Sequence, residues 1–325
     1  MSRDKKTLLR KFHQARWDEE IIFEMSVPGE RGILVREAED EVQSTIGDGV
    51  SALPDGLRRT EAPALPEVNQ MRVLRHYMHL SQETMGTDVT IDISQGTCTM
   101  KYSPKVQEHM VARHPGITEV HPLQPEETMQ GVLEYIYNLE SYLKEISGMD
   151  GFTFQPSGGA QGVYTGASII RAYHDSRGDT QRNEIITTMF SHPCDSAAPS
   201  TAGYNVITLM PDEGGYPDLE AMKAALSDRT AGIFITNPED TGIYNPKIRE
   251  YVDAAHQAGA LCYYDQANAN GMLGIARAKE AGFDLCHFNL HKTFSVPHGC
   301  MGNSVGAVGF TKDLAVFPPK PGVAY

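Results

Sequence analysis

Lys292 is the residue whose surroundings most suggest chemistry, because it lies between His291 and Thr293 directly after an apolar run. A lysine in an apolar setting loses solvation of its ammonium form, so its amine can act as a nucleophile. Asp265 stands at the tip of another apolar run, where a carboxylate is costly without a cationic partner. Only one expected strand and its crossover separate the two side chains, so both could reach the same ligand.

The small-residue loop from Gln155 to Gly162 runs directly into an expected helix. Its glycines would let backbone N–H groups approach an anion, and the helix dipole would favour a phosphate there. A tight turn explains the loop equally well. The loop contains neither G-x-G-x-x-G nor G-K-[ST], so it indicates no dinucleotide or Walker-type nucleotide site.

Two further apolar runs lead to His192 and Asn237. A single histidine after a strand is more often a structural hydrogen-bonding group than a catalyst. Pyridoxal phosphate, however, needs a lysine for a Schiff base, an anion cradle, a carboxylate on its ring nitrogen and a flat side chain against the ring. The groups at the strand ends together match these needs, so the sequence predicts pyridoxal 5'-phosphate as the cofactor.

A metal site is a less favoured interpretation of the same region. Possible ligands lie close together in the sequence: Cys286, His287, His291, His298 and Cys300. Their spacing matches no C-x-x-C or H-E-x-x-H pattern, so no metal ligand is predicted.

Short apolar runs alternate with amphipathic segments from about residue 126 onwards. A helix is expected to open at Pro125 and to end before Gly148. Strands are expected at 151–154, 184–187, 205–209, 232–236, 260–264, 283–287 and 305–310, with helices at 162–174, 218–226 and 246–258. This order predicts an α/β fold with a mostly parallel sheet and helices on both faces. Ligands of such sheets bind at the carboxyl ends of the strands.

The N-terminal third of the chain has a different character. Residues 26–70 are rich in proline, glycine and acidic groups and show little periodicity, which indicates an extended arm that wraps around something else. We therefore expect an N-terminal arm and helical segment over 1–125 and a cofactor-binding large domain over 126–315. Residues 316–325 are expected to start a small C-terminal domain that is absent from this chain.

Composition excludes several classes of protein. The 325 residues carry a formal net charge of −14, which argues against nucleic-acid and anionic-membrane partners. No stretch is apolar enough for a membrane helix, and the basic N-terminus has no apolar signal core behind it. The five cysteines are scattered and odd in number, which favours reduced thiols and a cytoplasmic protein.

The stretch from Asp284 to Gly299 resembles the pyridoxal-lysine motif of the glycine decarboxylase P-protein family. It is most similar to the second, C-terminal subunit of bacteria that divide this protein in two. Other stretches agree in the family's order: 22–32, 96–105, 121–131, 170–179 and 264–268. The resemblance implies a type I pyridoxal-phosphate fold, like that of aspartate aminotransferase. It also implies a glycine dehydrogenase (decarboxylating) reaction, in which the aminomethyl group passes to a lipoylated carrier protein.

The resemblance also implies roles for individual residues. Lys292 would hold the cofactor, Asp265 would pair with the ring nitrogen and His192 would stack on the ring, which makes these three the expected catalytic residues. The remaining cofactor contacts would come from the phosphate-binding loop, from the residue before the lysine and from two ring-lining residues: Ser157, Gly159, Ala160, Gln161, His291, Asn237 and Ala267. The expected substrate contacts are Cys98, Thr99 and Tyr102.

The chain departs from the family pattern near the expected ring site. The family usually has His-Gly-Thr-Asn-Pro-Ala-Ser where this chain has residues 192–198, so Pro193 removes a backbone donor and Asp195 adds a negative charge. The run after the lysine, 299–306, is bulkier than the family's glycines, and Gln266 replaces a glycine.

These departures leave two alternatives open. One is a specialised paralog that runs an aldol, transfer or deamination reaction on an amino acid, and the other is a non-catalytic partner subunit. In the glycine-cleavage interpretation the partners are glycine, the lipoylated carrier and a homologous first subunit. A homodimer or hetero-oligomer is expected, because sites of this fold are often shared between subunits.

Overall fold

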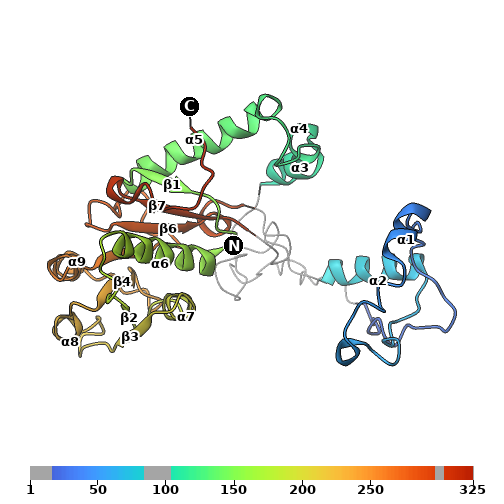
Figure 1. Cartoon of the computed structure of the whole chain (residues 1–325), viewed down its shortest axis with the longest axis horizontal. Coiled ribbons are helices and arrows are strands. Elements are labelled where there is room, and N and C mark those ends of the chain that lie inside the picture. Colours follow the sequence, from blue (N-terminus) through green and yellow to red (C-terminus); the bar gives the residue numbers. More distant parts are fainter. Residues whose placement is uncertain (1–16, 84–103, 297–303, 325) are drawn as a thin grey trace, which may run out of the picture. The chain divides into compact units, whose positions relative to one another are not determined.

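The computed structural model describes residues 17–83, 104–296 and 304–324. The chain forms two compact units, Met1–Gly86 (unit 1) and Thr87–Tyr325 (unit 2), whose elements are labelled in Figure 1. The domain boundaries expected at 125/126 and 315/316 remain predictions.

Unit 2 is built on a seven-stranded sheet with the order β1-β7-β6-β5-β4-β2-β3. Its strands are β1 (Gly151–Thr153), β2 (Glu184–Thr188), β3 (Asn205–Leu209), β4 (Thr230–Thr236), β5 (Leu261–Asp265), β6 (Leu285–Asn289) and β7 (Gly306–Phe310). Strands β3, β2, β4, β5 and β6 pair in parallel, while β7 pairs antiparallel with both β6 and β1. This arrangement confirms the expected mostly parallel α/β sheet, and every expected strand is present within a few residues.

Helices cover both faces of the sheet (Figure 1). Helices α6 (Gly159–Ser176) and α7 (Cys194–Thr201) pack on one face, and α5 (Gln130–Ser147), α8 (Leu219–Ala225) and α9 (Ile248–Gln257) belong to the core of the other. Side chains alternate along a strand, so Phe234 and Tyr263 contribute to the α6 core, whereas Ile233 and Cys262 contribute to the opposite core. Unit 2 therefore buries one apolar layer on each side of the sheet.

Glycines let α6 lie very close to the sheet. A Cβ atom at Gly166 would stand 2.2 Å from Cε2 of Tyr263, and one at Gly162 would stand 3.2 Å from Cδ2 of His287. The close approach fixes the start of α6 beside the carboxyl ends of β5 and β6, which is where the expected site residues lie.

Several helices differ from expectation. Helix α5 begins at Gln130 and not at Pro125, because Glu126–Thr128 form the separate 3₁₀ helix η2. Helix α7 was not expected, since it is short and contains Pro199. Helices α3 (Lys105–Arg113), α4 (Pro115–Thr118) and α10 (Leu290–Thr293) and the 3₁₀ helix η3 (Lys312–Leu314) complete the described part of unit 2. Across the described ranges no helix has the length and apolarity needed to cross a membrane.

Unit 1 contains α1 (Asp40–Ile46), η1 (Asp55–Leu57) and α2 (Gln70–Glu83). The arm expected over 26–70 therefore includes a helix and a helical turn, although α1 buries none of its residues. The N-terminal end of the described chain lies on α2: the Trp17 ring stacks on His79 at 4.1 Å between centroids, and a Glu19 carboxylate oxygen lies 2.9 Å from Nδ1 of His76.

Candidate active site

The expected site residues converge because β2, β4, β5 and β6 run parallel and end at the same edge of the sheet. His192 follows β2, Asn237 follows β4, Asp265 ends β5, and Lys292 lies in α10 immediately after β6. These four residues and Ala267 all line one pocket of about 610 Å³. The structure thus brings together five residues that the sequence singled out from four strand ends.

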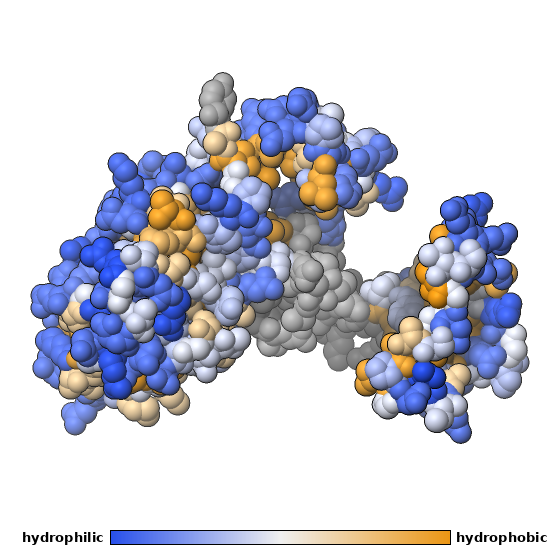
Figure 2. Space-filling view, viewed as in Figure 1, coloured by the Kyte–Doolittle hydropathy of each residue, from blue (hydrophilic) through white to orange (hydrophobic). Residues whose placement is uncertain are grey.

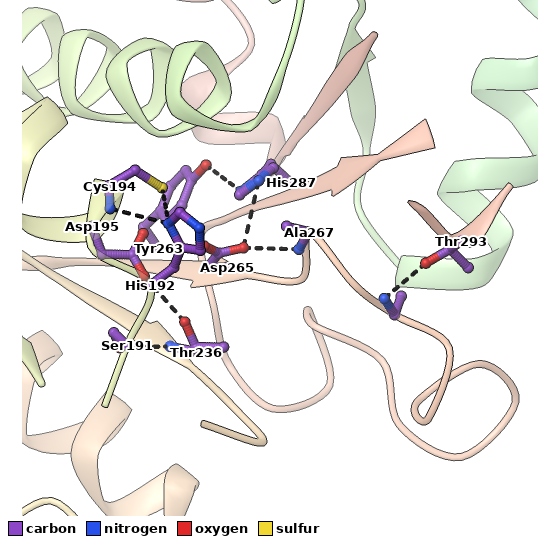
Figure 3. A network of polar contacts seen from close by, with 11 residues as sticks. Ser191, His192, Cys194, Asp195, Thr236, Tyr263, Asp265, Ala267, His287 and Thr293 are labelled. Carbon is purple, nitrogen blue, oxygen red and sulfur yellow. Dashed lines mark hydrogen bonds and ion pairs between the residues drawn. The ribbon is translucent and has the colours of Figure 1, made fainter. Parts of the chain in front are cut away.

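Asp265 is held firmly at the base of this pocket, with only 3% of its surface exposed. Its Oδ1 accepts a hydrogen bond of 2.8 Å from the Ala267 N–H and lies 3.5 Å from Nε2 of His287 (Figure 3). The hydroxyl of Tyr263 is 2.7 Å from Nδ1 of His287. Burial lowers the pKa of His287, so the imidazole is neutral. If the Tyr263 hydroxyl donates to Nδ1, the proton of the neutral imidazole lies on Nε2, which is 3.5 Å from Asp265 Oδ1 and makes no hydrogen bond with any described residue.

From the sequence, His287 is indicated only as a possible metal ligand, and Tyr263 is not singled out. Both lie inside apolar strands, where the sequence pattern does not distinguish a functional polar side chain from a structural one. The available signal was the two-residue period of a strand, which places Tyr263 on the same face as Asp265. His287 is paired with Asp265 across β5 and β6, which only the sheet register reveals.

Lys292 reaches the pocket from α10, a single helical turn after β6. The neighbouring Thr293 fixes this turn, because its hydroxyl accepts a hydrogen bond of 2.9 Å from the Ala269 N–H in the segment after β5 (Figure 3). The Leu290 N–H donates to the Val305 carbonyl oxygen at 3.0 Å. The lysine is therefore mounted on backbone that is tied to both neighbouring segments.

His192 contributes an exposed imidazole to the pocket wall. Its Nδ1 accepts from the Cys194 N–H at 3.1 Å and lies 2.9 Å from the Cys194 Sγ atom, so Cys194 sets the orientation of the ring (Figure 3). Burial raises the pKa of the Cys194 thiol, which therefore stays protonated.

Asn237 lines the pocket, but its side-chain amide is already engaged. Its Oδ1 accepts from the Asn245 N–H at 2.8 Å and its Nδ2 donates to the Asn245 carbonyl oxygen at 3.2 Å. The hydroxyl of Tyr264 donates to the Asn237 carbonyl oxygen. Asn237 therefore ties the start of the loop after β4 to the backbone of Asn245.

The expected phosphate-binding residues lie at the start of α6 and beside Lys292. Gln161 Oε1 accepts hydrogen bonds from both the hydroxyl and the N–H of Ser157, the latter at 2.7 Å. A Cβ atom at Gly159 would stand 2.6 Å from Nδ2 of Asn289, so no larger residue fits there. Among described residues, the lining of the 610 Å³ pocket includes neither this loop nor the buried His291. The expected substrate residues Cys98, Thr99 and Tyr102 fall outside the described residues.

Two groups of potential metal ligands occur in the described part of the chain. Each brings three ligand atoms within 4.8 Å of one another: Cys194, Asp195 and Asp265 in one group, and His256, Cys262 and Asp284 in the other. In the second group Asp284 already accepts from the Cys262 N–H at 2.7 Å and contacts Nε2 of His256 at 2.8 Å. Neither group contains Cys286, His287 or His291, while His298 and Cys300 fall outside the described residues.

Comparison with known proteins agrees with this geometry. The aminotransferase class-V family model matches residues 165–318. The structure of a glycine decarboxylase P-protein, solved with an inhibitor bound, superposes with a TM-score of 0.64 at 20% identity. The superposition covers 87% of this chain and 64% of the P-protein chain. A Burkholderia pseudomallei sphingosine-1-phosphate lyase superposes with a TM-score of 0.58 at 13% identity, covering 79% of this chain and 62% of its own. The fold is that of a type I pyridoxal-phosphate enzyme.

Curated relatives narrow this class to a family. The protein named probable glycine dehydrogenase (decarboxylating) subunit 2 of Thermococcus kodakarensis is 46% identical over 314 residues, which cover 97% of this chain and 61% of the relative. Its namesake from Caldanaerobacter subterraneus subsp. tengcongensis is 45% identical over 303 residues, covering 93% of this chain and 61% of the relative. The chain thus spans about three fifths of the length of these relatives. Over that length it belongs to the glycine decarboxylase P-protein family.

Proposed function

We propose that this chain is the cofactor-holding part of a pyridoxal-phosphate-dependent glycine decarboxylase, which passes the aminomethyl group to a lipoylated carrier protein. The observation that carries the proposal is the pocket of about 610 Å³ that combines Lys292, Asp265 and His192. The relatives named glycine dehydrogenase (decarboxylating) subunit 2 support the choice of reaction.

The residues of the pocket fit pyridoxal 5'-phosphate in kind and in placement. Lys292 would hold the cofactor covalently through Nζ, and Asp265 would pair with the ring nitrogen from the base of the pocket. His192 would lie against the ring, with its imidazole oriented by Cys194. The phosphate would lie at the start of α6, where the first backbone N–H groups of a helix favour an anion.

The bound cofactor would supply an electron-withdrawing ring that stabilises the charge left on the α-carbon of an amino acid. The protein would orient the cofactor and the substrate and would hold or transfer protons. Asp265 is kept in place by the Ala267 N–H and faced by His287, so it is preorganised for a cationic ring nitrogen. Lys292 would also be an amine of the pocket that could hold or move a proton.

Borohydride reduction tests the cofactor assignment. The purified chain loaded with pyridoxal phosphate should show a visible absorption band that borohydride abolishes, leaving a covalent adduct on the peptide that contains Lys292. The Lys292→Ala variant should lack both band and adduct. Lys223→Ala is the matched control, because this lysine pairs with Glu220 on α8 and should leave both signals intact. A wild-type protein that gains no band would point to the non-catalytic partner subunit.

Isotope exchange tests the reaction itself. With the lipoylated carrier and the homologous first subunit present, carboxyl-labelled glycine should exchange its label with CO2, and Lys292→Ala should abolish the exchange. A loaded protein that exchanges no CO2 and responds spectrally to a different amino acid would contradict the glycine assignment and indicate a specialised paralog.

The partner assignment is supported by unit 1, which leaves many apolar side chains on its surface. We propose that this surface contacts the homologous first subunit or a second copy of the chain, in the cytoplasm. Leu34 and Val35 are 75% and 84% exposed, so changing both to aspartate should leave folding intact and weaken assembly in analytical ultracentrifugation. Unchanged assembly in this variant would count against the proposed role of unit 1.

A further inference from the structure

Asp195 lies directly behind the carboxylate that forms the base of the pocket. Asp195, in the first turn of α7, has no exposed surface. Oxygen atoms of the Asp195 and Asp265 side chains lie within 4.8 Å of each other (Figure 3). Asp265 lines the pocket of about 610 Å³, whereas Asp195 is not among its lining residues.

The hydrogen bonds of Asp195 are incomplete. Its Oδ2 accepts from the Thr236 hydroxyl at 3.1 Å. Its Oδ1 is buried, and within the described residues no donor reaches it. A buried carboxylate oxygen without a donor is costly, and a second carboxylate beside it adds repulsion. A proton on Asp195 removes both costs, because its hydroxyl can then donate to Asp265.

The surroundings decide which member of the pair carries the proton. Asp265 accepts from the Ala267 N–H at 2.8 Å and lies 3.5 Å from Nε2 of His287, whereas the only side-chain donor to Asp195 among the described residues is the Thr236 hydroxyl. The charged form is therefore better stabilised on Asp265. Burial first, and the neighbouring Asp265 second, raise the pKa of Asp195 well above its usual range.

We propose that Asp195 and Asp265 hold one proton between them at neutral pH, carried by Asp195, which donates it in a hydrogen bond to the Asp265 carboxylate. Asp195 is thus a positioning residue that acts through Asp265. Two such interacting carboxyl groups titrate as a pair.

Other titratable side chains surround the pair. They come from β5, β6, α10 and the segments that follow β2 and β4: Tyr263, His287, Lys292, His192, Cys194 and Asp240. Burial raises the pKa values of Cys194 and Tyr263 and lowers that of His287, so these three are neutral. The negative charge of Asp240 favours the shared proton, while the positive charge of Lys292 opposes it.

The consequence for the ring site rests on the proposed function. A carboxylate that already accepts a hydrogen bond is a weaker base, so Asp265 would leave the proton on the ring nitrogen of the cofactor. Loss of the Asp195 proton at higher pH would remove this hydrogen bond and place a second negative charge next to Asp265.

Infrared spectroscopy of the purified full chain, without added cofactor, tests the shared proton. Wild type at neutral pH should show the C=O band of a buried protonated carboxyl group, and Asp195→Asn, which keeps the shape and a donor, should lack it. Glu239→Gln is the control, because burial also raises the pKa of Glu239. This control should leave the Asp195 band in place. A wild type without the band, or an unchanged band in Asp195→Asn, would overturn the proposal.

A second measurement uses the pH dependence of folding. A carboxyl group with a raised pKa in the folded state binds a proton there that the unfolded chain releases above a pH of about 3.9. As the pH rises above this value, the ratio of the wild-type unfolding constant to that of Asp195→Asn should therefore increase about tenfold per pH unit. The increase should stop once the pH passes the pKa of the group in the folded protein. Parallel pH profiles would overturn the proposal.

Neither measurement needs the cofactor, so failure of the proposed function would leave both readouts intact. If Asp195→Asn does not fold, the infrared measurement on the wild-type protein alone tests the shared proton. Raising the pH must convert its protonated carboxyl band into carboxylate absorption while the protein remains folded, and a band that is independent of pH in the folded protein would sink the proposal.

Discussion

Units 1 and 2 use apolar side chains in opposite ways. Unit 2 buries its apolar residues in two layers around the sheet, so that Leu143, Phe283 and Ile185 have almost no exposed surface. Unit 1 leaves Ile33, Leu34 and other apolar side chains exposed, and Figure 2 shows orange patches among the blue and white residues of its visible face. Unit 2 therefore has a core of its own, whereas the described part of unit 1 leaves much of its apolar surface exposed.

The largest effect that we expect follows from closing the gap between α6 and the sheet. In Gly166→Leu the new Cβ would collide with the Tyr263 ring, 2.2 Å away in the native backbone. The variant should lose at least about 3 kcal/mol of stability in urea unfolding followed by circular dichroism. Gly131→Ala on α5 is the control, because its Cβ meets no atom within 4 Å. It should raise stability slightly, by about 0.5–1 kcal/mol.

A matched pair of leucines tests the contrast between the units directly. Leu143→Ala in unit 2 removes a fully buried side chain and should cost about 2–5 kcal/mol. Leu34→Ala in unit 1 removes a side chain that is 75% exposed and should change stability by less than about 0.5 kcal/mol. Equal losses of unfolding free energy for the two variants, measured by urea unfolding of the isolated chain, would contradict this contrast between the units.

Acid should loosen unit 1 through Glu19. Hydrogen bonds from His79 and His76 lower the pKa of Glu19, so its stabilising contribution is present above the unfolded pKa near 4.5 and is lost as the pH falls through the folded value. Trp17 is the only tryptophan of the chain and stacks on His79, so its fluorescence should report an acid transition. Glu19→Gln should shift that transition to higher pH or abolish it. A fluorescence profile identical to wild type would contradict the role of Glu19.

Alkali should affect unit 2 slightly, through His256. The hydrogen bond with Asp284 raises the pKa of His256, so its contribution is present below the unfolded pKa of about 6.5 and is lost as the pH rises through the folded value. The imidazole is 37% exposed, so we expect only a few tenths of a kcal/mol. Urea unfolding between pH 6 and pH 8 should show this loss in wild type and not in His256→Gln. A steeper pH dependence of the unfolding free energy in His256→Gln than in wild type would contradict the stabilising role of His256.

Much of unit 2 was predictable from local pattern. Apolar runs such as 205–209 coincide with strands, and the polar groups after them proved to share one pocket, because parallel strands must end at a common edge. The sequence could not predict α7, whose proline and weak amphipathicity hide the helix. The ring-lining role expected for Asn237 stays a prediction, and the structure adds that this pocket residue is bonded through its amide to the Asn245 backbone.

Residue types and neighbours along the chain were enough to predict the α/β alternation and the family resemblance, and they singled out Lys292, Asp265 and His192, which line one pocket and whose chemical roles stay predictions. Only the tertiary structure decided that Asp195 lies against Asp265 and that His287 and Tyr263 stand behind the same carboxylate. Such contacts depend on sheet register, helix placement and burial, and these physical quantities are set by the packing of segments far apart in the chain.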